Sequence, residues 1–271
     1  MALNEDESGR RVADERGGSP FAHLPAPTAG KISSRGVKLA ERIASTLVQD
    51  IIDAGLGPGE RLPNEAAMAQ RFEVGRGSVR EALRILEVHG LISLRSGPKG
   101  GPVIVAVDPR DVGRTLSIYL SVRGATMAEL IQTRHFLEPV VARLAAENRT
   151  DEEADRLKEF LAQERNTSRR GDYLDAANDF HYLLATMTGN RVVDLMATAL
   201  KELYTTRLIA TGVATATTDP TLGEEHRDIG DAIIDGDGDR AEARMRAHMG
   251  VYEERVRETA PGFRASRLVW E

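Results

Sequence analysis

Apolar residues recur every three to four positions between Val37 and Ile52, which is the periodicity of an amphipathic helix. The same reasoning predicts a short second helix from Pro63 to Phe72 and a third from Arg76 to His89. Gly90 follows the third pattern directly, in the position where glycine commonly ends a helix. This part of the chain therefore predicts three consecutive helices.

The pattern changes after Gly90. Residues 91–95 alternate weakly between apolar and polar, and residues 103–107 are mostly β-branched. The segment 96–102 between them consists mainly of glycine and proline, so a β-hairpin is predicted here. Three helices followed by a hairpin are the layout of a winged helix-turn-helix, a domain that places its third helix in the major groove of DNA.

Helical periodicity continues beyond Asp108. The predicted helices span residues 109–122, 126–147, 151–170, 172–188, 191–211, 221–235 and 238–259. Helices of this length with short connections suit one antiparallel bundle. The predicted fold class is mainly α: an N-terminal winged helix-turn-helix followed by an all-α antiparallel helical bundle.

Composition sets the expected domain boundaries. Residues 1–35 are rich in Gly, Ser, Pro and charge, which predicts a flexible arm whose arginines either contact DNA or stay solvated. The winged helix-turn-helix is expected at 36–107, the bundle at 108–260, and a C-terminal tail at 261–271.

The charge balance and the missing cysteines limit the possible functions. The net charge is −6, yet residues 36–107 carry 9 Lys/Arg against 8 Asp/Glu, whereas residues 108–271 carry 22 against 29. An acidic protein of this kind can still present a small cationic surface to DNA. The lack of cysteine, of a long apolar run and of a signal-peptide core predicts a cytoplasmic protein without disulfides or a membrane segment.

The third helix carries the chemistry expected of a DNA-reading helix. Arg76, Arg80 and Arg84 follow i, i+4, i+8 spacing and line one stripe, while Gly77 and Ser78 keep the first turn slim. The alternative is a solvated helix whose arginines pair with nearby glutamates. The hairpin tip, with Ser96, Gly97 and Lys99, is either a cationic wing that contacts DNA or a simple flexible turn.

Two stretches give a more specific indication. The run LGPGERLPNE at 56–65 and the run GSVREALRILEVHGLI at 77–92 resemble the GntR family of transcription regulators. The resemblance implies that the loop and recognition helix contact DNA, and here the residues at those positions are Glu65, Gly75, Arg76, Gly77, Ser78 and Arg80. The chain departs from the family pattern at Asn64, Ala66 and Gly75, so its operator is expected to differ from common family sites.

The bundle resembles the FadR-type effector domain of the same family, called FCD. The supporting stretches begin at Arg134, Phe180, Glu225 and Ala241. The resemblance implies a homodimer that binds double-stranded operator DNA with two-fold symmetry and responds to a small metabolite, either an organic acid or an acyl-coenzyme A-like molecule. Repression is the predicted mode of control.

Three histidines share a feature that does not depend on the resemblance. His181, His226 and His248 lie on the apolar stripes of three different predicted helices, from which imidazoles can converge on a divalent metal. The alternative is that each is a hydrogen-bonded core residue. The resemblance implies zinc or a similar cation held by three histidines and an acid. Because Ala177 occupies the usual position of the acid, the predicted fourth ligand is Asn178 or water.

Two further residues are candidates for effector binding. Arg134 lies on the inner face of its helix, where the resemblance implies pairing with an acidic effector; the alternative is a buried salt bridge to Glu138. Asn190 is the second candidate, with helix capping as its alternative.

Two rival functions are considered. A metal-dependent hydrolase would use three histidines and an open coordination position, but no nucleophile elbow or phosphate-binding glycine loop accompanies them. A DNA-packing protein would need a broadly basic surface.

Overall fold

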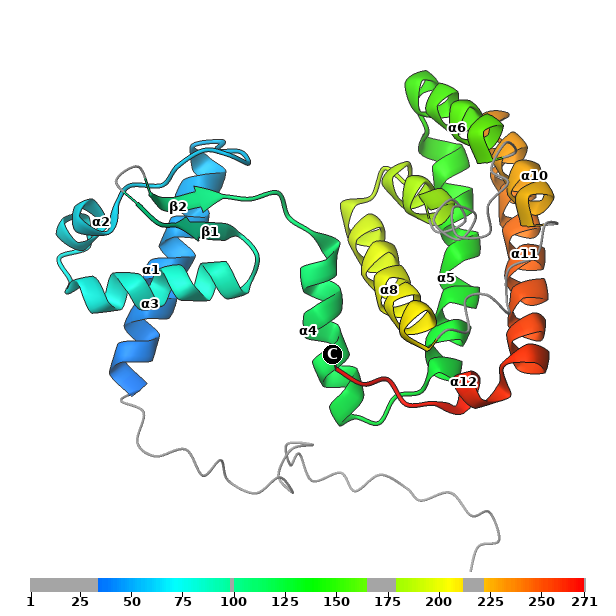
Figure 1. Cartoon of the computed structure of the whole chain (residues 1–271). Helices are drawn as coiled ribbons and strands as arrows, with labels where there is room; N and C mark the ends of the chain where they lie inside the picture. Colours follow the sequence, from blue (N-terminus) through cyan, green and yellow to red (C-terminus); the bar gives the residue numbers. More distant parts are fainter. Residues whose placement is uncertain (1–33, 98–99, 165–178, 212–221, 271) are drawn as a thin grey trace, which may run out of the picture.

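A computed structural model describes residues 34–97, 100–164, 179–211 and 222–270 of the chain (Figure 1). The first half contains three helices, α1 (Ser34–Asp53), α2 (Glu65–Arg71) and α3 (Arg76–Val88). Their apolar faces form one buried cluster in which Ala40, Met68 and Leu83 are almost fully enclosed. Asn64 caps α2 by accepting a hydrogen bond from the backbone N–H of Ala67, which fixes where that helix begins.

The wing is a two-stranded antiparallel hairpin. Strand β1 (Ile92–Arg95) pairs with β2 (Gly101–Ile104), with Ile92 opposite Ile104. The prediction that the second strand spans 103–107 is wrong at both ends. Strand β2 begins earlier because Gly101 pairs with Arg95. It ends at Ile104, whose backbone N–H bonds to the carbonyl oxygen of Glu60 at 2.9 Å. The segment before α2 thus lies along the far side of β2.

The second half is the predicted helical bundle. Its helices are α4 (Pro109–Val122), α5 (Met127–Asn148), α6 (Asp151–Glu164), residues 179–186, α8 (Arg191–Ala210), α10 (Leu222–Ile234) and α11 (Gly238–Thr259). Helix α5 is the central element and packs against α8, α10 and α11. Helix α4 covers the outer side of α8 (Figure 1). The predicted class, a mainly α chain with a winged helix-turn-helix and a bundle, is therefore confirmed.

Helix boundaries agree closely with the sequence pattern. Helix α1 begins at Ser34, three residues before the predicted start, and α4 matches its predicted range. The arm at 1–33 and parts of the predicted helices 151–170, 172–188 and 221–235 lie outside the described residues. None of the described helices is both long and apolar enough to cross a membrane.

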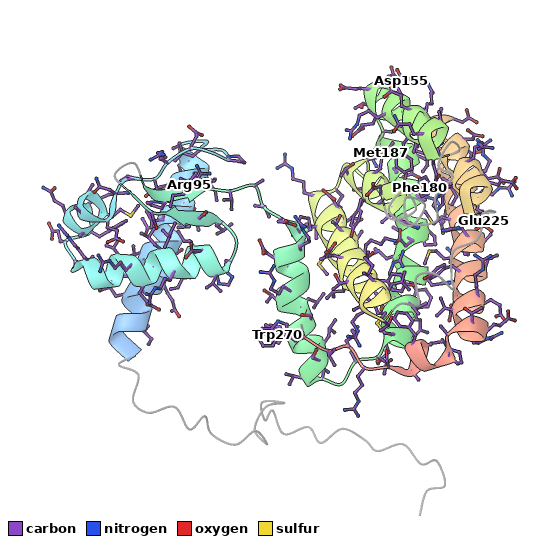
Figure 2. The ribbon with its side chains drawn as sticks, viewed as in Figure 1. Arg95, Asp155, Phe180, Met187, Glu225 and Trp270 are labelled. Carbon is purple, nitrogen blue, oxygen red and sulfur yellow. The ribbon has the colours of Figure 1, made fainter. Side chains whose placement is uncertain are left out.

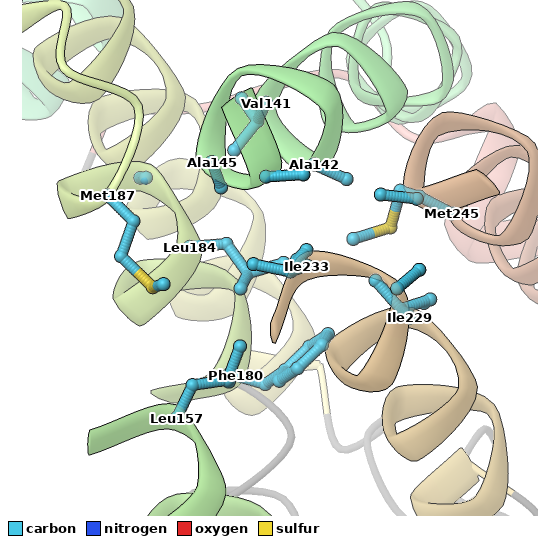
Figure 3. Packing of buried hydrophobic residues seen from close by; sticks show 14 of the residues in the cluster. Val141, Ala142, Ala145, Leu157, Phe180, Leu184, Met187, Ile229, Ile233 and Met245 are labelled. Carbon is cyan, nitrogen blue, oxygen red and sulfur yellow. The ribbon is translucent and has the colours of Figure 1, made fainter. Parts of the chain in front are cut away.

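The main core of the bundle is built from small and branched side chains. Phe180, Leu184 and Ile233 are completely buried, and Ala142 and Ala145 on α5 let the neighbouring helices approach closely (Figure 3). This core fixes the relative positions of α5, α10, α11 and the helix at 179–186. These are the elements that carry the predicted histidines and Arg134.

The C-terminal segment is packed against the bundle. Helix α12 (Pro261–Ala265) follows α11 directly, and Leu268 is only 4% exposed. The backbone N–H of Leu268 bonds to the carbonyl oxygen of Ala125 at 2.8 Å, and Arg267 forms a β-bridge with Thr126. Trp270 projects from this end of the chain and is largely exposed (Figure 2). The segment therefore ties the end of the chain to the junction between α4 and α5.

Candidate nucleic-acid interface and metal centre

Helix α3 has one buried and one exposed face. Val79, Leu83 and Leu86 are no more than 2% exposed, which confirms the predicted core stripe. The predicted arginines Arg76, Arg80 and Arg84 are all exposed on the opposite side. The amphipathic pattern thus anchors the helix from within and leaves its cationic stripe available to a partner.

The N-terminal turn of α3 is open. Gly75 occupies the cap position with extended backbone and supplies no side-chain hydrogen bond to the first turn. A Cβ added at Gly75 or Gly77 would meet no atom within 4 Å, so neither glycine is required by packing inside the domain. The free backbone N–H groups of such a turn are suited to a phosphate oxygen.

Two of the predicted DNA-contact residues contact each other. The Nε atom of Arg80 donates to Oε2 of Glu65 at 2.8 Å, which joins α3 to α2 and orients the guanidinium. Arg84 lies at the distance limit for an ion pair with Glu81, 4.0 Å. In the wing Ser96 and Gly97 are exposed, and Lys99 lies outside the described residues.

The three predicted histidines meet inside the bundle. His181, His226 on α10 and His248 on α11 are 7%, 1% and 4% exposed, and one ligand atom from each lies within 4.8 Å of the others. One tetrahedral zinc ion holds its nitrogen ligands roughly 3.4 Å apart, and the three imidazoles approach this separation. Asn178, the predicted fourth ligand, lies outside the described residues.

Each histidine is held by a different carboxylate through the same ring atom. Nδ1 of His181 lies 2.8 Å from Oε2 of Glu138, and Nδ1 of His226 lies 2.7 Å from Oε1 of Glu164. Nδ1 of His248 lies 2.7 Å from Oε2 of Glu225 on α10, which Figure 2 labels. A carboxylate bonded to Nδ1 leaves Nε2 as the free ligand atom, the arrangement found around metal-binding histidines.

The electrostatics also favour neutral imidazoles. Burial, opposed by the charge of Glu138, lowers the pKa of His181 well below its usual value. Burial, together with the nearby His248, does the same to the pKa of His226. Burial alone would raise the pKa of Glu138, but His181 and Arg134 outweigh it and hold that pKa well below its usual range. Burial raises the pKa of Glu164 to about 7. Neutral imidazole is the form that binds a metal, so the donor set fits a divalent cation.

Comparison with known proteins identifies both halves of the chain. Residues 39–99 match the family described as bacterial regulatory proteins, gntR family, and residues 129–251 match the FCD domain. The HTH-type transcriptional regulator LutR of Bacillus subtilis is 30% identical over 214 residues, which cover 74% of this chain and 97% of LutR. The HTH-type transcriptional repressor NanR of Escherichia coli K12 is 31% identical over 216 residues, 78% of this chain and 82% of NanR. The chain belongs to the GntR family of bacterial regulatory proteins.

A solved structure supports the same assignment. The structure described as Streptococcus agalactiae GntR matches with a TM-score of 0.62 and 26% identity, covering 79% of this chain and 99% of that one. The GntR-family chain is therefore a helix-turn-helix transcription regulator with an FCD domain, and it is not an enzyme. Because the chain belongs to a family of transcription regulators, the three histidines do not make it a metal-dependent hydrolase.

The two predicted effector contacts of this GntR-family regulator have other partners in the structure. Nε and Nη2 of Arg134 both donate to Oε1 of Glu138, at 3.1 and 2.9 Å, so the buried salt bridge is present. The side-chain oxygen of Asn190 accepts hydrogen bonds from the backbone N–H groups of Val192 and Val193 and caps α8. A contact of either residue with an effector stays a prediction.

Sequence reasoning missed Lys201, a buried residue of α8 in this GntR-family bundle. Its side chain is 6% exposed, and Nζ lies 5.8 Å from the centre of the Tyr204 ring. The signal was available: Lys201 shares a helical face with Ala197, Tyr204 and Leu208, all of which are buried. Glu164 and Glu225 were also missed, because nothing in the local sequence indicates which histidine a distant carboxylate will meet.

Proposed function

We propose that this regulator is a dimeric repressor that binds a pseudo-palindromic operator. A small organic acid bound in the bundle controls whether the dimer stays on that operator or leaves it. The observation that carries the proposal is the convergence of His181, His226 and His248 inside the effector domain, each with Nδ1 engaged by a carboxylate. A carboxylate on Nδ1 orients each ring and leaves Nε2 as the atom that can take a ligand.

The DNA-reading surface is assigned to α3 and the wing. Gly75, Arg76, Gly77 and Ser78 form the N-terminal turn, which in helix-turn-helix proteins meets base edges and phosphates. Arg80 and Arg84 continue the same exposed stripe, with Glu65 holding Arg80 in place. The wing residues Ser96, Gly97 and Lys99 are assigned to the neighbouring backbone or minor groove. Exposure and positive charge support this assignment.

The metal site is assigned to the three histidines. Their Nε2 atoms would hold a divalent cation, with zinc the expected ion because the donors are neutral imidazoles. Asn178 or water would fill a further position. When bound, the cation supplies a Lewis-acidic centre that an oxygen of the effector can ligate.

Control of DNA binding follows from how the two halves are joined. Residues 105–108 connect β2 to α4 (Figure 1). Operator half-sites lie at a fixed spacing, so a small change in the placement of two DNA-binding domains lowers the affinity for paired sites. The name of the relative NanR includes the word repressor, and repression is accordingly the mode proposed for this chain.

Selection from a random duplex library tests the DNA-binding part of the proposal. Purified full-length protein should enrich a sequence with two symmetric half-sites, and native mass spectrometry should show two chains per complex and one divalent cation per chain. Enrichment of no defined sequence, or a monomer without metal after incubation with zinc, would contradict the proposal. The matched control is the triple variant His181→Ala, His226→Ala, His248→Ala, which should lose the cation.

A further inference from the structure

Glu87 of α3 forms a hydrogen bond with the wing. Its Oε1 atom accepts from the backbone N–H of Leu94 in β1 at 2.9 Å. Glu87 is an exposed residue in the last turn of α3, so apolar packing does not hold it there. The bond joins the helix assigned to the major groove to the hairpin assigned to the neighbouring backbone or minor groove.

The pairing of the hairpin leaves this N–H group without a partner in the sheet. Leu94 lies opposite Pro102, whose carbonyl oxygen accepts from the backbone N–H of Leu62 on the far side of β2. Opposite residues of an antiparallel pair either bond to each other or both point away, so the N–H of Leu94 points away from β2. Within the described chain β1 has β2 as its one strand neighbour, and Glu87 supplies the acceptor that a third strand would otherwise provide.

The bond acts on the part of the wing that the core does not cover. Ile92, at the start of β1, is 2% exposed and belongs to the same buried cluster as the inner face of α3. Leu94 is 37% exposed, and Arg95 after it is exposed as well. Glu87 thus restrains the strand at the point where apolar packing against α3 ends.

Arg95 is the cation that this bond places. It is exposed on the wing, where Figure 2 labels it, and no ion pair joins it to an acid among the described residues. Its cross-strand neighbour is Gly101, which has no side chain to cover it. A Cβ added at Gly100 would lie 2.2 Å from the carbonyl oxygen of Arg95, so the turn closes tightly beside it. An exposed guanidinium on a slim hairpin is suited to a phosphate oxygen.

We infer that Glu87 is a positioning residue of the DNA interface. It holds the wing at a fixed place beside α3, so that Arg95 meets a phosphate while α3 lies in the major groove. The inference rests on the proposed assignment of α3 and the wing to the DNA-reading surface. An acid on a surface that faces DNA repels the phosphates, so the charge of Glu87 by itself weakens binding. Glu87 improves binding through the backbone group that it holds in place.

Two substitutions of similar size separate the charge of Glu87 from its hydrogen bond. Glu87→Gln removes the charge and keeps an oxygen that accepts from Leu94, so affinity for DNA should stay equal or rise. Glu87→Met removes both, so affinity should fall by roughly 3- to 10-fold, as when one hydrogen-bonded contact is lost. Glu81→Met is the matched control, because Glu81 is an exposed acid of the same helix whose carboxylate lies beside Arg84. It should not weaken binding.

The full-length protein is titrated against the duplex that it selects from the random library, over a range of salt concentrations. Arg95→Ala should weaken binding and lower the slope of log affinity against log salt concentration by about 1. Glu87→Met should lower this slope in the same way. Combining the two substitutions should add little, because both remove the same contact. Amide hydrogen exchange at Leu94 of the free protein should be slow in wild type and Glu87→Gln and faster in Glu87→Met.

Four results would overturn the inference: equal duplex affinity of Glu87→Met and wild type, an equal loss in Glu87→Gln and Glu87→Met, no effect of Arg95→Ala, or losses of Glu87→Met and Arg95→Ala that add independently. Thermal melts of the free variants show that each is folded. If wild type selects a duplex and one of these four results is found, the role of Glu87 fails alone. If wild type selects no defined duplex, the proposed function itself fails.

Discussion

Oε2 of Glu225 lies 2.7 Å from Nδ1 of His248, although the two residues belong to different helices, α10 and α11. The carboxylate is partly exposed, whereas the imidazole is buried. An acid in this position fixes the ring orientation and makes Nε2 a stronger donor. The pair therefore joins two helices and prepares one ligand atom at the same time.

Removing this carboxylate should weaken metal binding without unfolding the protein. Glu225→Gln is expected to lower zinc affinity by about 10- to 100-fold, the usual effect of losing such a partner. Competition with a chromophoric chelator measures the change. Glu224→Gln is the matched control, because Glu224 is the adjacent, exposed residue of α10. Equal affinities of the two variants would show that Glu225 does not support the site.

The buried pair of Arg134 and Glu138 should be essential for stability. Glu138→Gln is expected to lower the free energy of unfolding of the bundle by about 3–5 kcal/mol, because it leaves buried cations without their counter-charge. Chemical denaturation followed by far-UV circular dichroism measures it. In Glu147→Gln, on the same helix, only an exposed pair with Arg143 is lost, so the change should be small. A small effect of Glu138→Gln would show that the pairs of Glu138 with Arg134 and His181 do not stabilise the bundle.

The docked C-terminal segment should contribute to the bundle. Leu268→Ala is expected to cost about 2–3 kcal/mol of unfolding free energy, since it removes a buried leucine from a site that can partly close. Val269→Ala is the control, because Val269 is 45% exposed. Thermal and chemical denaturation of both variants give the comparison. Equal stabilities would mean that the segment does not stay in its docked position in solution.

Much of the fold was predictable because the local periodicity of apolar residues shows which face of each helix is buried. Val79, Leu83 and Leu86 identify the buried face of α3, and the spacing of His181, His226 and His248 placed them on inward faces of separate helices. The end of β2 was not predictable, because it depends on pairing with the distant residue Glu60.

The surroundings of the histidines depend on tertiary contacts in the same way. Glu164 and Glu225 reach their partners only after α6, α10 and α11 have packed. Lys201 was recognisable as an inward-facing residue, but its closeness to Arg134 and Glu138 is a property of the assembled bundle. The periodicity of the sequence predicts which face of a helix is buried. Which side chain lies opposite a given residue in the core depends on how the helices pack.

The equilibrium affinity of α3 variants for the selected operator tests the central claim most directly. If the arginine contacts a base, Arg76→Ala and Arg80→Ala should each reduce the free energy of operator binding by about 1–3 kcal/mol. If it contacts a phosphate, each should weaken binding and lower the slope of log affinity against log salt concentration by about 1. Arg156→Ala, an exposed arginine of α6, is the control and should bind as wild type does. The account predicts a loss in both α3 variants; unchanged affinity and unchanged salt dependence in both would contradict it.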